Sequence, residues 1–204
     1  MSVLSALRKG TSGLIKRQVV VVGQTDIMFD RYAGDNNTEL QPWDRAYYAP
    51  DGKTFVLPSL NIMSFLSGMN TSSAPKRLLD PRKYKKIAAA CLSYIQISPM
   101  IIPFMRDGKP IILGTPDGDR DEQSGAFITY GVARLEKGIP NPKARPTLPV
   151  PWSLMFNLDI FPNDEIQEQQ ICDLFVRGGL ALGFGTYRGV YGKFVVESWD
   201  ERID

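Results

Sequence analysis

Residues 178–196 have the sequence Gly-Gly-Leu-Ala-Leu-Gly-Phe-Gly-Thr-Tyr-Arg-Gly-Val-Tyr-Gly-Lys-Phe-Val-Val, which is the most informative stretch of this 204-residue chain. Six glycines fall within its first fifteen residues, among aromatic side chains, and the stretch carries two cations, Arg188 and Lys193. Glycine adopts backbone angles that other residues avoid and lets another backbone approach closely. Close approach, ring faces and positive charge together suit a nucleic-acid strand. A tight turn with a bulge and no ligand explains the same glycines equally well.

The neighbouring elements exclude a dinucleotide-binding loop. Such a loop follows a strand and opens a helix. Here the order is reversed, because residues 164–177 have the apolar spacing of a helix and residues 193–197 that of a strand. The apolar stripe of the helix is Ile171, Leu174 and Phe175, and we interpret it as core. Asn163 and Asp164 are expected to cap this helix.

The same succession of elements occurs at the start of the chain. Residues 18–22 are a β-branched run that predicts a buried strand, and residues 60–67 predict a helix capped by Ser59. Residues 153–161 alternate between apolar and polar side chains and predict a third strand. Two βαβ-like halves favour the α+β class, with a ferredoxin-like (RRM-like) antiparallel sheet that carries insertions. We expect residues 19–22, 154–160 and 193–196 in one sheet, with both helices on one face.

Two further stretches are expected outside this sheet. We expect residues from about 70 to 125 to form an insertion and residues from about 126 to 151 to form an arm. The arm holds five prolines, which exclude a helix and favour an extended, projecting chain, with Lys143 and Arg145 between them.

Composition limits the chemistry that the chain can perform. It has no histidine, which removes triads with a histidine base and the usual zinc sites. Its two cysteines, Cys91 and Cys172, have apolar neighbours and are predicted to be buried thiols. The net charge of +2 is compatible with nucleic acid without requiring it. No apolar run approaches the roughly 18 residues of a membrane span, and the first residues lack a signal-peptide pattern. We therefore expect a cytoplasmic protein with no membrane partner.

Three segments together resemble the RAMP superfamily of CRISPR-associated proteins, and most closely the backbone subunit that lines the guide RNA in type III effector complexes. The first is the glycine-rich stretch, which ends in Arg188-Gly189-Val190-Tyr191-Gly192-Lys193-Phe194. The second is the glycine, hydrophobic, proline and serine segment at residues 51–59, and the third is the basic, proline-bearing stretch that leads into a strand at residues 141–160. The resemblance spans about residues 19–199. After Pro58 the family continues with glycine, two serines, an aliphatic residue, lysine and glycine, and that lysine and final glycine are absent here.

The resemblance implies a single RAMP-like domain over residues 1–204, with a thumb-like arm. It implies an RNA-binding subunit that polymerises along a guide RNA in a cytoplasmic ribonucleoprotein complex of antiviral defence, without a cofactor. The implied partners are single-stranded guide RNA, copies of the chain itself and other CRISPR effector subunits. The candidate RNA-binding residues are Gly183, Gly185, Tyr187, Arg188, Gly189 and Lys193 in the glycine stretch, Lys143 and Arg145 in the arm, and a basic segment of Arg82, Lys83, Lys85 and Lys86. A solvated helix face explains the basic segment equally well.

An endoribonuclease is the first alternative. In type III relatives a loop aspartate ahead of the proline-serine helix cleaves target RNA, and Asp44 lies at the matching place, fourteen residues before Pro58. Such catalysis would be the one reason to expect Mg²⁺ or Mn²⁺. A surface ion pair in which Trp43 and Arg45 hold Asp44 is the non-catalytic explanation. The nearby carboxylates of Asp26, Asp30, Asp35 and Glu39 are mostly expected to be solvated.

The second alternative is a mobile-element protein that mimics or blocks a CRISPR complex by docking onto it. Such a protein would bind no RNA of its own. Co-purified nucleic acid therefore separates it from the RNA-binding subunit.

Overall fold

The fold is built on a central antiparallel sheet. The computed structural model describes residues 13–35, 38–67, 73–134 and 140–203. Strand β1 (Ile15–Gly23) lies between β10 (Ser153–Ile160) and β11 (Phe194–Glu201), and β4 (Ile95–Ser98) pairs with the other edge of β10. Val19 lies opposite Phe156 on one side and Trp199 on the other. The prediction that the three strands share one antiparallel sheet is confirmed.

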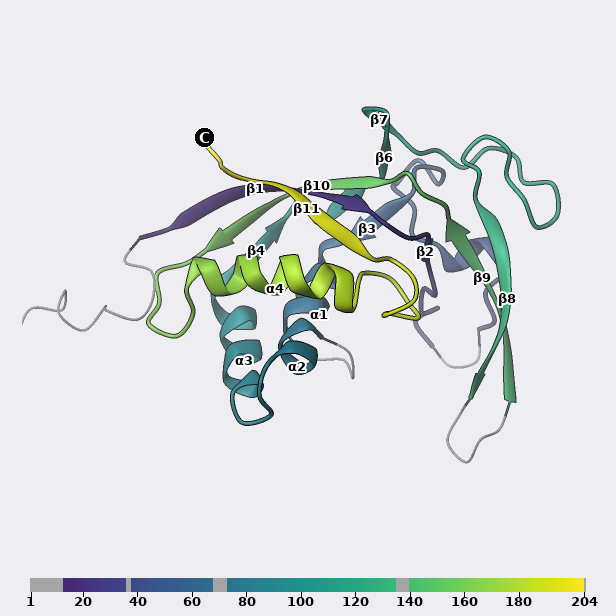
Figure 1. Cartoon of the computed structure of the whole chain (residues 1–204). Coiled ribbons are helices and arrows are strands. Elements are labelled where there is room, and N and C mark those ends of the chain that lie inside the picture. The colour runs from purple at the N-terminus through teal and green to yellow at the C-terminus, as the bar shows by residue number, and fades with distance from the viewer. Residues whose placement is uncertain (1–12, 36–37, 68–72, 135–139, 204) are drawn as a thin grey trace, which may run out of the picture.

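The helices cover one face of this sheet (Figure 1). They are α1 (Ser59–Ser67), α2 (Ala74–Leu78), α3 (Tyr84–Tyr94) and α4 (Glu168–Ala181). Successive side chains of a strand point to opposite faces of the sheet, and the helices cover the apolar face. Leu154 and Phe156 are therefore fully buried, while Met155 between them is exposed. The rings of Phe65 on α1 and Phe175 on α4 meet beneath the sheet, with centroids 5.4 Å apart. Burial of these aromatic and aliphatic side chains is the main stabilising contribution.

Helix α4 begins later than its sequence predicts. Asn163 does not cap it, because its side-chain oxygen accepts hydrogen bonds from the amides of Glu165 and Ile166 at 2.9 and 2.8 Å and so closes a separate turn. The helix starts at Glu168, with Gln167 and Gln170 forming a reciprocal capping box. The expected cap at Asn163 and Asp164 was therefore wrong.

Shorter elements surround the sheet. Strand β3 (Val56–Pro58) pairs with β5 (Ile101–Pro103), and β6 (Met105–Arg106) pairs with β7 (Lys109–Pro110) at the margin of β10. A 3-10 helix, η2 (Trp43–Arg45), precedes them. Most of these elements fall within the stretch expected as an insertion, yet β4 from the same stretch pairs with β10 of the central sheet.

A hairpin extends to one side of the sheet and helices (Figure 1). It consists of β8 (Phe127–Arg134) and β9 (Pro140–Leu148), paired from Phe127 opposite Thr147 to Arg134 opposite Pro140. Strand β2 (Ile27–Met28) joins β9 only at Leu148 and Thr147. The proline-bearing stretch is thus largely the second strand of a hairpin. None of the described helices is long and apolar enough to span a membrane.

Candidate nucleic-acid interface

Residues 183–192, the glycine loop, connect α4 to β11. Gly183, Gly185, Gly189 and Gly192 all have left-handed φ angles, of +81°, +75°, +93° and +70°. A Cβ atom on Gly192 would lie 2.1 Å from the Phe184 carbonyl oxygen, and one on Gly183 would lie 2.4 Å from that of Gly192. One on Gly185 would lie 2.6 Å from the Met28 carbonyl oxygen, whereas one on Gly189 would meet nothing closer than 4.0 Å. Internal packing therefore requires three of these glycines, and only the backbone angle requires Gly189.

Most amides of the glycine loop are occupied by the fold. The Phe184 amide donates to Gly192, that of Thr186 to Met28, and that of Gly192 to Asp26, at 2.7–3.0 Å. Within the described part of the chain, the amides of Gly185 and Tyr187 form no hydrogen bond. Few amides therefore remain for phosphate, and side chains must supply most contacts to a nucleic acid.

Arg188 turns partly inward. Its Nε donates to the Gly185 carbonyl at 3.2 Å, and its Nη2 lies 3.5 Å from Ser64 Oγ on α1. Burial lowers the pKa of this guanidinium from its usual value. The side chain braces the glycine loop against α1, in addition to any contact with RNA.

Tyr187 joins the glycine loop to the hairpin. Its φ is +51°, which is uncommon for a residue with a side chain, and 43% of its surface is exposed. Its hydroxyl donates to the Val132 carbonyl on β8 at 3.3 Å. The guanidinium of Arg145 on β9 stacks over its ring, 5.2 Å from the centroid. The structure thus brings together Tyr187 and Arg145, two of the predicted site residues.

Arg145 is a buried structural cation. Its Nη2 lies 2.7 Å from Asp30 Oδ2, and Asp30 also pairs with Arg45 at 3.0 Å. Asp30 therefore bridges two arginines and is not the solvated carboxylate that the sequence suggested. Asp26 is also engaged, because it accepts a hydrogen bond from the Val150 amide at 3.1 Å.

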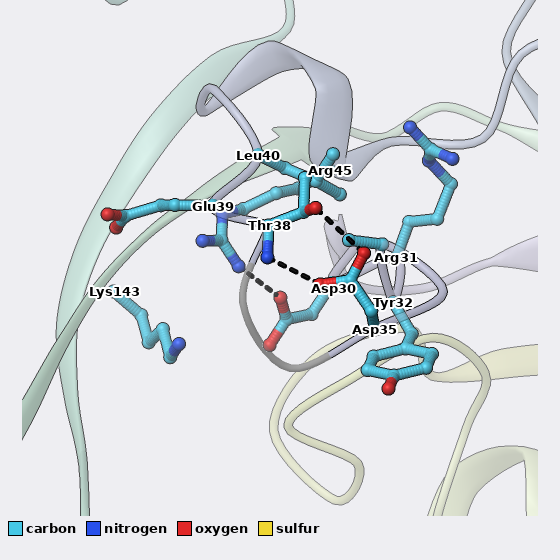
Figure 2. Close-up of a pocket in the computed structure, with 10 residues that line it drawn as sticks. Asp30, Arg31, Tyr32, Asp35, Thr38, Glu39, Leu40, Arg45 and Lys143 are labelled. Carbon is cyan, nitrogen blue, oxygen red and sulfur yellow. Dashed lines mark hydrogen bonds and ion pairs between the residues drawn. The ribbon is translucent and has the colours of Figure 1, made fainter.

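Lys143 on β9 and Lys193 directly before β11 are both half-buried. Lys143 lines a pocket of about 490 Å³ together with Arg31, Arg45 and the carboxylates of Asp30, Asp35 and Glu39 (Figure 2). The charges of this pocket are balanced, so it does not attract a polyanion by itself. Lys193 is fixed through its backbone, since its carbonyl accepts from the Gln24 amide at 2.7 Å and its amide donates to Thr25 Oγ1 at 3.0 Å.

The basic segment lies elsewhere. Arg82, Lys83, Lys85 and Lys86 are all exposed around the start of α3. Helix α3 lies toward the other end of α4 from the glycine loop (Figure 1). No described acidic residue forms an ion pair with these cations. The structure therefore does not join the basic segment to the glycine loop.

Asp44 is exposed in η2, and it is not held as the sequence suggested. Arg45 pairs with Asp30, and Trp43 Nε1 donates to the Gly118 carbonyl at 3.1 Å. Among the described residues the Asp44 carboxylate has no hydrogen-bond or ion-pair partner. Burial, with further contributions from the charges of Asp44 and Asp121, raises the pKa of Tyr48. No group of three carboxylate, thiol or imidazole side chains in the described ranges is placed to hold a metal ion.

A second, smaller pocket lies between the hairpin and the glycine loop, and sequence reasoning missed it. It encloses about 130 Å³ and is lined by Met28, Thr129, Tyr130, Gly131, Arg145, Tyr187 and Tyr191. The available signal was Gly131, because an isolated glycine in a strand marks a bulge or the close approach of another group.

The chain is similar to a chain in a solved structure described as a cryo-EM structure of the type III-B Cmr-beta bound to cognate target RNA. The TM-score is 0.51 and the sequence identity 12%, and the match covers 92% of this chain. The chain spans 60% of the length of that neighbour. At this identity the likeness concerns the fold. No family model matches the sequence, and no curated protein matches it.

Proposed function

We propose that this protein is an RNA-binding subunit of a CRISPR-type effector complex and lies along a single-stranded guide RNA. The observation that carries the proposal is a fold likeness over 92% of the chain to a chain of a complex bound to target RNA. The junction of glycine loop and hairpin supplies an exposed ring and cations next to that fold. These are the groups that hold a nucleic-acid strand without reading its sequence.

The strand order supports a ferredoxin-like assignment. The order β11-β1-β10-β4 is antiparallel throughout, and helices connect β1 to β4 and β10 to β11 on one face. We therefore propose a βαββαβ succession of the ferredoxin-like type, with β2 and β3 inserted after its first strand and β5–β9 between its second and third strands. The hairpin then takes the place of the thumb-like arm.

Backbone binding would leave the bases free to pair with a target. Lys143 and Lys193 would contact phosphates, and the ring of Tyr187 would contact a base or sugar. The basic segment would extend the contact along the helical layer or reach RNA held by a neighbouring copy.

Head-to-tail packing of copies gives an open filament when the rotation does not close. Light scattering should then show growth of the particle with RNA length, and a monomer with and without RNA would contradict it.

The direct test is RNA binding followed by fluorescence anisotropy at two salt concentrations. Single-stranded RNA should bind at about 50 mM salt and weaken steeply by about 200 mM, because cations on the protein release counterions from phosphates. The variants Lys143→Gln and Lys193→Gln should each bind all sequences more weakly, while Lys109→Gln on β7 removes the same single charge and serves as their control. Absence of binding at low salt would refute the function and favour the docking protein that carries no RNA.

Cleavage by Asp44 is a second candidate, favoured by one observation. Its carboxylate is exposed and without a partner among the described residues, so it is available to a substrate. RNA supplies its own 2′-hydroxyl nucleophile, and a positioned general acid or base typically accelerates a reaction by about 10²–10⁴-fold. Assembled protein should then cut a labelled RNA complementary to the guide in Mg²⁺ or Mn²⁺, and Asp44→Ala should abolish cleavage without loss of binding. Intact target under these conditions would leave an RNA-binding subunit only.

A further inference from the structure

We propose that β11 and the outer side of α4 together form a docking site for an extended, basic segment of a partner protein. Strand β11 lies at one edge of the central sheet, where it pairs with β1 on one side and with no described strand on the other. An unpaired edge presents backbone donors and acceptors that another chain can join as a further strand. The proposal does not depend on RNA binding, because this edge lies outside the residues proposed above to contact RNA.

The register shows which backbone groups face the free edge. The Arg202 amide donates to the carbonyl of Lys16, the residue opposite it in the pairing of β11 with β1, at 3.1 Å. In an antiparallel pair such hydrogen-bonded positions recur at every second residue. Asp200 therefore also bonds to β1, whereas the amides and carbonyls of Trp199 and Glu201 point to the free edge.

An apolar stripe on α4, which runs beneath β11, is left uncovered (Figure 1). It consists of Cys172, Val176 and Leu180, which follow one another at intervals of about one helical turn. Val176 and Leu180 are 48% and 52% exposed, although both are aliphatic. Further apolar side chains could therefore be buried against this stripe.

Two glycines show on which side of α4 the stripe lies. A Cβ atom on Gly178 would lie 2.9 Å from Ala74 Cβ of α2, and one on Gly179 would lie 2.5 Å from the Phe194 carbonyl oxygen of β11. Each residue of a helix is rotated by about 100° from the one before it. Leu180 comes next in this rotation, so the stripe lies beyond β11 and away from α2. A strand added to the free edge would place every second side chain over the stripe.

The charges at this edge select the occupant. Glu197 and Asp200 are exposed, and no described cation forms an ion pair with either. These carboxylates repel a nucleic-acid strand. They also disfavour a second copy of β11, because antiparallel self-pairing would bring the carboxylates of both copies together. A segment that alternates basic and aliphatic residues complements the backbone groups, the stripe and the carboxylates at once.

The test uses the full chain and a fluorescein-labelled peptide of alternating valine and lysine, about as long as β11. Fluorescence anisotropy should show binding, and hydrogen exchange followed by NMR should locate it. In the free protein the amides of Trp199 and Glu201 should exchange faster than that of Asp200, and the peptide should slow both. Two N-methylated peptides, one methylated at every valine and the other at every lysine, should differ, because only one set of amides faces β11. One should bind and the other should not.

Two variants with matched controls test the side chains. Val176→Lys removes one aliphatic contact and adds a repelling charge, and it should lower the peptide affinity by at least about tenfold. Leu92→Lys makes the same kind of change at a similarly exposed position of α3 and should leave the affinity unchanged. The pair Glu197→Gln and Asp200→Asn should lower the affinity by about fivefold. The pair Glu122→Gln and Asp107→Asn removes the same charge elsewhere and should have no such effect.

The outcomes distinguish this docking site from other occupants. Absence of peptide binding, equal affinities of the two methylated peptides, or unchanged exchange at Trp199 and Glu201 would overturn the proposal. These three measurements use the unaltered protein, so they decide the question even if Val176→Lys lowers the melting temperature. A dimer in light scattering that Val176→Lys converts to a monomer would also overturn it and identify a second copy as the occupant. RNA that displaces the peptide from the free edge would identify a nucleic acid instead.

Discussion

The glycine loop and the basic segment differ in how far the fold uses their residues. In the glycine loop, Gly183, Gly185 and Gly192 touch other backbone atoms, and Arg188 is folded against α1. In the basic segment all four cations are exposed and paired with no described acid. The pattern that looked most like a binding loop is therefore largely structural, and the segment that looked like an ordinary helix face has the freer charges. Substitutions in the glycine loop should therefore lower stability more than RNA binding, and substitutions in the basic segment should lower RNA binding more than stability.

The largest effect is expected at Gly192. Gly192→Ala introduces a Cβ atom 2.1 Å from the Phe184 carbonyl oxygen at a φ of +70°. Strain alone costs about 1–3 kcal/mol, and with the clash we expect the free energy of unfolding to fall by about 4 kcal/mol. Urea denaturation measures this, with Gly189→Ala as a control that should lose only about 1 kcal/mol. Equal losses at both glycines would show that the glycine loop rearranges and is not rigid.

The next effect is expected at Arg145. Arg145→Ala leaves Asp30 with Arg45 as its described ion-pair partner and removes the stacking on Tyr187. Removal of one partner of a buried pair costs about 3–5 kcal/mol, and because Asp30 is partly exposed we expect a loss of about 2 kcal/mol. Arg145→Lys, which keeps the charge without the planar fork, should recover part of it. A loss that resembles that of a surface lysine would contradict the view that this cation is structural.

A smaller effect should depend on pH at the start of α4. The hydrogen bond from Arg17, at 2.6 Å, lowers the pKa of Glu168. Because the folded pKa lies below the unfolded value of about 4.3, this contribution is present above that pH and is lost as the pH falls through the folded pKa. Glu168→Gln should reduce the free energy of unfolding by about 1.5 kcal/mol at pH 7.

The difference should begin to narrow near the Glu reference pKa of about 4.3 and should close as the pH falls through the lower folded pKa. Thermal unfolding across this range measures it. The variant should keep its RNA affinity at pH 7, since Glu168 lies at the opposite end of α4 from the glycine loop. A difference that does not narrow at all as the pH falls below about 4.3 would mean that packing, and not charge, explains the loss.

The smallest effect on stability is expected in the basic segment. Replacement of Arg82, Lys83, Lys85 and Lys86 by glutamine should change the free energy of unfolding by less than about 0.5 kcal/mol. If these residues contact phosphates, the slope of log affinity against log salt should fall by about 0.7 for each contact. An unchanged slope would make the segment a solvated helix face.

The central sheet could be predicted because its signals are local. The β-branched run of β1 and the alternation in β10 depend only on neighbouring residues, and both strands formed in one sheet as expected. The start of α4 could not be placed, because Asn163 had two amides of its own turn within reach. Asn163 closes a turn and does not cap α4, and this turn includes Ile166, whose side chain is buried in the core. Burial of Ile166 depends on the tertiary fold and cannot be read from neighbouring residues.

The candidate site was harder to predict because its members are paired over long distances. Arg145 and Asp30 are 115 residues apart, and nothing in either neighbourhood indicates the pair. The glycines were recognised from the sequence, yet their separate reasons, namely a clash at Gly192 and a backbone angle at Gly189, need coordinates. Gly131 was a sequence signal of the smaller pocket, but the open space beside it is known only from the coordinates.

Because β2 pairs with β9 over only two residue pairs, the hairpin is attached near one end and its far end is free to move. Strand β2 pairs with it at Leu148 and Thr147, the Phe29 amide donates to the Pro146 carbonyl at 2.9 Å, and Asp30 pairs with Arg145. The five residues of β9 beyond Arg145, from Ala144 to Pro140, extend roughly 17 Å past this point at about 3.3 Å per residue. A rotation of a few degrees at this point moves the far end of the hairpin by a larger distance. A ligand that strengthens the contact between Tyr187 and the Val132 carbonyl would therefore reduce this movement. Amide hydrogen exchange in β8 should therefore slow when RNA is added, and it should slow more at Val132 than at Phe127.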